Sequence, residues 1–112
     1  MIVGKNGLIL WGIMYKEHWN KMGVLLETNP ELINVSIGHY ENGEPECIDA
    51  TLHFKHLISA SVSMFLDEPI DSEVVFTIHR DKTLLVADSL PIDELVERIK
   101  TAIKKCDEYV YK

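Results

Sequence analysis

Residues 58–66 have the sequence Ile-Ser-Ala-Ser-Val-Ser-Met-Phe-Leu, in which every second side chain is apolar and three serines lie between them. Successive side chains of a β-strand point to opposite faces of a sheet, so this alternation describes a strand with one buried face. A helix would place its apolar residues three and four positions apart. The stretch therefore predicts a half-buried strand rather than a helix.

The same alternation recurs on both sides of this stretch. It predicts further strands over residues 33–37, 48–54, 74–78 and 83–87. The connections between them have typical turn compositions. Residues 41–45 centre on Asn42-Gly43, the dipeptide that tight hairpins favour, residues 67–71 form a loop, and Asp81-Lys82 makes a short turn.

Two segments have helical periodicity. Residues 11–26 repeat apolar side chains at helical spacing up to Asn29-Pro30, although Gly23 weakens this helix and residues 8–12 also fit a short strand. Residues 92–106 form one continuous apolar stripe, with acids in the first turns and lysines later, which matches the helix dipole.

Together these elements predict an α+β fold over a single domain, residues 1–112. We expect an antiparallel sheet of about five strands, arranged as a meander. A single layer of strands needs an apolar layer to pack on, so we expect the N-terminal and C-terminal helices to cover one face of the sheet.

Composition restricts the function classes. The 112 residues are 46% hydrophobic and 26% charged, as in ordinary globular domains, and the formal net charge is −7. A negative field of this size disfavours nucleic acid and anionic membranes as partners, and it suits association with a basic protein. Cys47 and Cys106 form no CxxC motif, and no signal peptide or membrane span is recognisable. We therefore expect a cytoplasmic protein with reduced thiols.

No sequence motif predicts an enzyme. GxSxG, HExxH, GxxxxGK[ST] and GxGxxG are all missing. Cys47 begins a strand beside an acidic turn, which raises the pKa of a thiol, and Cys106 lies on the apolar stripe of the last helix. Of the five histidines, only His53 and His79 are expected to share the polar face of the sheet. We therefore expect no catalytic residues, no metal and no cofactor.

One group of charged residues stands out in the sequence, because its carboxylates are expected to lie close together. In a meander, the loops after the first and third strands emerge at the same end of the sheet. These two loops carry seven carboxylates and no lysine or arginine, namely Glu41, Glu44, Glu46, Asp67, Glu68, Asp71 and Glu73. Acids favour turns for local reasons, but a cluster of this size also predicts a docking surface for a basic protein.

The polar face of the predicted sheet is also unusual, because it carries small hydroxyls and aromatics and few charges. It is formed by Asn34, Ser36, Tyr40, Thr51, His53, Ser59, Ser61, Ser63, Phe65, Thr77 and His79. Tyrosine, serine and asparagine make protein contacts at low entropic cost, so this face is either a partner surface or is covered by another segment or a second subunit.

These features lead to three alternatives. The first is a non-enzymatic inhibitor, such as a bacterial immunity protein that neutralises a basic, nuclease-like toxin by occlusion, with the acidic loops as the docking surface and Tyr40 or Phe65 as an apolar anchor. The second is a small-molecule-binding domain or small enzyme that uses the polar face with His53 and His79. The third is a homodimer that buries this face between two chains.

Overall fold

The computed structural model describes residues 16–110. The elements follow in the order α2 (Lys16–Met22), the 3₁₀ helix η1 (Gly23–Thr28), β1 (Leu32–His39), β2 (Pro45–His53), the 3₁₀ turn η2 (Lys55–Leu57), β3 (Ile58–Phe65), β4 (Val74–Arg80), β5 (Thr83–Leu90) and α3 (Ile92–Val110). All four pairs of neighbouring strands are antiparallel.

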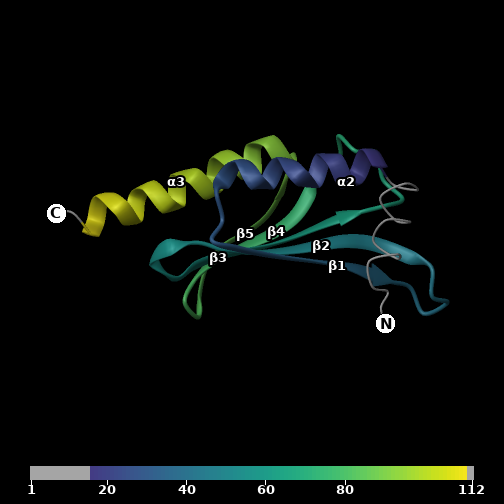
Figure 1. Ribbon diagram of the computed structural model, residues 1–112, viewed down its shortest axis with the longest axis horizontal. Coiled ribbons are helices and arrows are strands. Elements are labelled where there is room, and N and C mark those ends of the chain that lie inside the picture. Colours follow the sequence, from purple (N-terminus) through teal and green to yellow (C-terminus); the bar gives the residue numbers. More distant parts are fainter. Residues whose placement is uncertain (1–15, 111–112) are drawn as a thin grey trace.

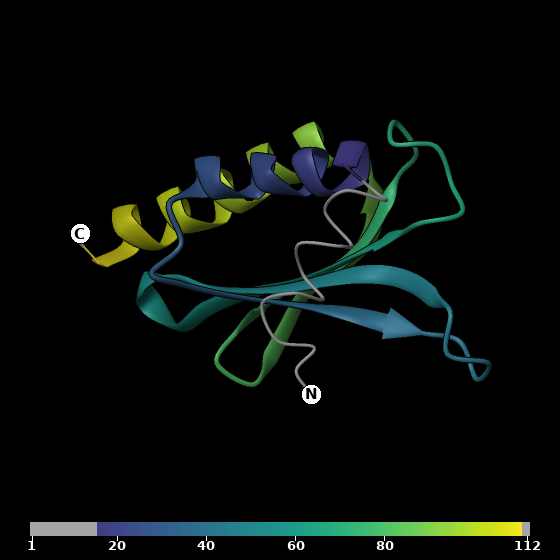
Figure 2. The same cartoon turned by 45° about the vertical axis from the view of Figure 1, so that its right-hand side comes forward.

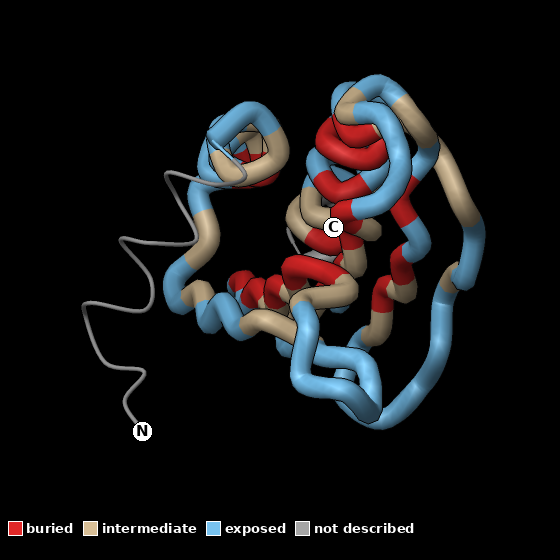
Figure 3. The backbone as a smooth tube through the Cα atoms, turned by 90° about the vertical axis from the view of Figure 1, so that its right-hand side faces the viewer, coloured by how far each residue is buried: buried red, intermediate tan, exposed pale blue. Residues whose placement is uncertain are grey.

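The five strands lie side by side in sequence order, β1-β2-β3-β4-β5, and α2, η1 and α3 cover one face of the sheet (Figures 1 and 2). The predicted α+β meander with both helices on one face is therefore confirmed. Viewed end-on, the buried stretches of α3 and of the strands face one another, while the loops lie in solvent (Figure 3).

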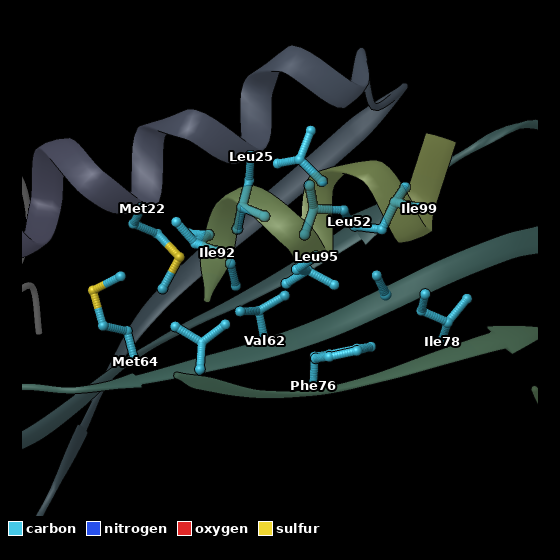
Figure 4. Close-up of a cluster of buried hydrophobic side chains, with 14 of the residues drawn as sticks. Met22, Leu25, Leu52, Val62, Met64, Phe76, Ile78, Ile92, Leu95 and Ile99 are labelled. Carbon is cyan, nitrogen blue, oxygen red and sulfur yellow. The ribbon is translucent and has the colours of Figure 1, made fainter. Parts of the chain in front are cut away.

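The core lies between this helical layer and the sheet. Alternate side chains of β2, β3 and β4 are almost fully buried, including Leu52, Val62 and Phe76. They meet Leu25 from η1 and Leu95 from α3 (Figure 4). Apolar burial of this kind stabilises a fold by roughly 25 cal/mol per Å² removed from water, so the shared apolar faces hold the two layers together.

The N-terminal helix departs from its prediction. The described part begins at Lys16, so residues 1–15, with the start of the predicted helix and the alternative strand at residues 8–12, lie outside the described residues. At Gly23 the α-helix gives way to 3₁₀ geometry instead of continuing to residue 26. The segment ends at Asn29, which adopts a left-handed conformation (φ 53°) and donates its N–H to the Leu26 carbonyl. Asparagine tolerates this conformation better than most residues.

The C-terminal helix continues to Val110, one turn past its predicted end at residue 106. The extension reaches the corner between β2 and β3. There Asp107 Oδ1 lies 2.7 Å from His56 Nε2 and 3.0 Å from Lys55 Nζ. His56 and Leu57 both have positive φ angles, 63° and 62°. The side chains of Lys55 and His56 thus tie the last turns of α3 to a strained corner of the sheet.

The hydrogen bond from His56, and next the one from Lys55, lower the pKa of Asp107 below its ordinary value of 3.8. A carboxylate with a depressed folded-state pKa stabilises the protein above its unfolded pKa and loses that effect as pH falls through the folded pKa. Asp107→Asn is therefore expected to reduce the free energy of unfolding at neutral pH, and the difference from wild type should vanish well below pH 3.8. Urea denaturation of both proteins, from neutral pH to well below pH 3.8, measures this difference in the free energy of unfolding.

The matched control is Glu97→Gln, which removes an exposed acid from the same helix. It should change stability little at either pH. A deficit in Asp107→Asn that persists unchanged at low pH would contradict an electrostatic role for this carboxylate.

Candidate protein-binding site

The two acidic loops emerge at the same end of the sheet, as predicted. Residues 40–44 connect β1 to β2, and residues 66–73 connect β3 to β4 (Figure 2). Six of the seven predicted carboxylates are exposed, namely Glu41, Glu44, Asp67, Glu68, Asp71 and Glu73. The seventh, Glu46, was predicted in the loop, but it lies in β2, where the register shifts between β1 and β2.

The first loop is a short, well-defined turn. Tyr40 donates its N–H to the Glu44 carbonyl (2.8 Å), and Gly43 donates its N–H to the Tyr40 carbonyl (2.9 Å). The Asn42 side chain accepts the N–H of Glu44 (3.0 Å), and Gly43 adopts a φ of 88°, which glycine accommodates without a Cβ clash. The turn therefore holds its carboxylates on a fixed backbone.

The two acidic loops are joined to each other. Leu66 donates its N–H to the Glu46 carbonyl (2.9 Å), which fixes the start of the second loop on β2. Desolvation, followed by the nearby carboxylates of Asp67 and Glu46, raises the pKa of the Tyr40 hydroxyl. Tyr40 thus places an aromatic ring between the two acidic loops while remaining 44% exposed.

Helix α2 brings further groups to this end, which periodicity did not predict. The His18 ring nitrogen Nε2 lies 2.7 Å from the Glu68 carbonyl oxygen, so it links α2 to the second loop. Lys21 pairs with Asp93 at the start of α3, with 3.2 Å between Nζ and Oδ2. Lys16 begins α2 at the same end (Figure 1). This end of the sheet, called the acidic end below, therefore also includes Lys16 and Lys21 among the described residues, and Lys21 is paired with Asp93.

The strand register confirms the composition of the predicted polar face. His53, Ser59 and His79 are direct neighbours across β2, β3 and β4, and Thr51, Ser61 and Thr77 form the next row. Phe65 lies opposite Cys47 on the same face and is half-buried. The remaining predicted members are Asn34 and Ser36 in β1, and Tyr40, which follows the strand in the turn.

A small polar network crosses this face between β2 and β3. Ser63 Oγ donates to Asp49 Oδ1 (2.6 Å), and the Cys47 thiol approaches the same carboxylate at 3.4 Å. Burial, and then the hydrogen bond and charge of Asp49, raise the pKa of Cys47 to about 11. The predicted direction for this thiol is confirmed. Because the thiolate is the nucleophilic form, Cys47 is a poor nucleophile at neutral pH.

Within residues 16–110, no three histidine, cysteine, aspartate or glutamate side chains gather closely enough to hold a metal ion. None of the helices in this range is long and apolar enough to cross a membrane. The chain matches no protein-family model, no curated protein and no solved structure. Function is therefore inferred from the residues and geometry of the site.

After burial, the hydrogen bond and charge of Asp49 contribute most to the raised pKa of Cys47, so removing the carboxylate should lower the pKa of the thiol. In a Cys106→Ala background, Asp49→Asn is expected to shift the midpoint of the pH–rate profile for iodoacetamide alkylation below about 11. Ser63→Ala is the matched control, because it removes a hydrogen bond to Asp49 and leaves the carboxylate. An unchanged midpoint in Asp49→Asn would show that burial alone raises the pKa.

Gly38 lies opposite Cys47, and the close approach leaves no room for a side chain. A Cβ at residue 38 would come within 2.7 Å of Cys47 Sγ and 3.3 Å of Asp49 Oδ2. Gly38→Ala is expected to reduce the free energy of unfolding by roughly 1–2 kcal/mol through overpacking. Adding Cys47→Ala should recover most of this loss. Gly23→Ala, where a Cβ meets nothing within 4 Å, is the control and should be neutral or stabilising in urea denaturation.

Proposed function

We propose that this protein is a non-enzymatic binding domain that docks a basic protein partner through its acidic end. The observation that carries the proposal is the junction of the two acidic loops. Their backbones are linked between Glu46 and Leu66, and Tyr40 lies close to the carboxylate of Asp67, while six carboxylates around them remain exposed. A surface of this kind is pre-organised, so little conformational entropy is lost when it binds.

The charge distribution favours fast and selective association. The net charge is −7, and the exposed carboxylates concentrate on two neighbouring loops. Like-signed charges gathered on one surface steer an oppositely charged partner and can raise association rates by 10–1,000-fold or so at low salt. Lys21 does not oppose this field strongly, because Asp93 already pairs with it.

An apolar anchor lies beside the carboxylates. Tyr40 is 44% exposed between the loops, and Phe65 is half-buried on the adjoining sheet face. Aromatic residues in such positions commonly provide much of the binding energy of an interface, while surrounding charges set rate and specificity. Tyr40, Phe65 and the acidic loops would thus act as one contact surface.

The kind of partner follows from the chemistry of the surface. Proteins that bind nucleic acid present basic grooves to phosphates, and a rigid cluster of carboxylates offers the same charge. We infer an inhibitor that occludes such a groove, of the type that a bacterial immunity protein provides against a cognate nuclease-like toxin in the cytoplasm. The raised pKa of Cys47 is consistent with a binding role rather than thiol catalysis.

The test is affinity capture at low salt with tagged protein, followed by kinetics on the captured partner. The bait variant is Glu44→Lys/Asp71→Lys, one reversal in each acidic loop. The control bait, Glu27→Lys/Glu97→Lys, has the same net charge but changes exposed acids outside the loops. Wild type and control should retain a basic, stoichiometric partner that salt elutes, and the loop variant should lose it.

With the purified partner, the loop variant should associate more slowly, and its association rate should depend less on salt concentration. If the two variants behave alike, total charge rather than the acidic end governs binding, and the assignment of the site is wrong.

A further inference from the structure

The two edges of the sheet differ in how they are protected against pairing. An exposed edge strand presents unpaired backbone groups, and proteins usually protect it with charges that discourage another strand. Strand β5 carries Asp88, which lies opposite the buried Phe76 and therefore on the helix-covered face of the sheet. Strand β1 carries no charged residue from Leu32 to Gly38, and most of it is exposed.

An apolar groove runs along the unprotected edge. It lies between α2, η1 and β1, and its walls are apolar side chains and one glycine, namely Trp19, Met22, Gly23, Leu26, Ile33 and Val35. Leu26 is 56% exposed and Val35 is 37% exposed. Among residues 16–110 no further strand pairs with β1, and large apolar side chains grouped beside such an edge indicate an interaction surface.

The sequence of β1 is complementary to itself. In antiparallel pairing, residues directly opposite each other point to the same face, so only registers that keep this parity bury the apolar side. Centring a two-fold axis on Val35 places Ile33 opposite the Ile37 of a second copy and Asn34 opposite its Ser36. The same register places Glu31 opposite His39. Moving the axis to Ser36 places Glu31 opposite Glu41 instead, which repels.

We propose that a second copy of this chain pairs with β1 in the antiparallel register centred on Val35. The pairing makes one continuous sheet through both copies, with Ile33, Val35 and Ile37 on the helix-covered side. It also brings the two apolar grooves together across the axis, so Leu26 and Val35 become buried. At both ends of the strand this register places Glu31 opposite the second copy's His39, whose imidazole can donate a hydrogen bond to a carboxylate, whereas the register centred on Ser36 places two carboxylates together.

This interface leaves the acidic loops accessible. Because the paired strands run in opposite directions, the acidic ends of the two copies lie at opposite ends of the joined sheet. Dimerisation therefore does not depend on the proposed inhibitor function, and either one can fail without the other.

Light scattering after size exclusion, from low to high micromolar concentration, tests the proposal on the full chain. Wild type should have the mass of two chains at high concentration. Val35→Lys places two ammonium groups at the axis and should give a monomer. Leu84→Lys is the matched control on β5, where the side chain is similarly exposed (53%), and it should stay dimeric.

Charge exchange tests the register. Glu31→Lys and His39→Glu should each weaken the dimer severalfold, and the double variant should restore it, because it places an ammonium group opposite a carboxylate at each end of the strand. Circular dichroism verifies that each variant is folded. A monomeric wild type at high micromolar concentration overturns the proposal, and so does a dimer that Val35→Lys leaves intact. If the wild type is a monomer and Val35→Lys also melts earlier than Leu84→Lys, the groove is covered from within the chain.

Discussion

The fold depends on one constraint, which is that a sheet with most of its apolar residues on one face must be covered on that face. Strand β3 expresses the constraint most clearly. Ile58, Ala60, Val62 and Met64 are buried, and the serines between them point to the other side. Residues directly opposite each other in paired strands point to the same face of the sheet. The register therefore places the buried residues of β2 and β4 on the same face as those of β3. The helical layer then has only one face on which to pack.

The position of the candidate binding site follows from the same topology. In a meander the chain reverses direction after each strand, so the loops after the first and third strands must lie at the same end of the sheet. The β1–β2 turn and the β3–β4 loop are neighbours because β2 pairs directly with β3, so the Glu46 carbonyl near the start of β2 accepts the N–H of Leu66 just after β3. The cluster of negative charge is therefore a consequence of strand order combined with the preference of acids for turns. The position of Tyr40 beside Asp67, which contributes to the raised pKa of the Tyr40 hydroxyl, is a feature beyond that preference.

The elements that the sequence predicted correctly are those set by local periodicity. Alternation places every strand, and the apolar stripe of α3 fixes its buried face. The features that could not be predicted from the sequence depend on contacts between residues that are far apart in the chain. The pairing of Lys21 with Asp93 joins residues 72 apart, and no periodic pattern carries that information. Likewise, the extension of α3 past residue 106 is held by His56 and Lys55 from the other side of the fold.

The first α-helix ends at Met22 instead of residue 26 because local conformational preferences compete there. Residues 23–26 continue the apolar spacing of an α-helix, but Gly23 favours it less than other residues do, and Pro30 prevents its continuation. The resulting 3₁₀ helix η1 still buries Leu25, whose side chain packs in the core. It also leaves Leu26 exposed beside β1. The conformational change at Gly23 therefore shapes the groove at the sheet edge. That edge, unlike the β5 edge with Asp88, lacks a charge to prevent pairing.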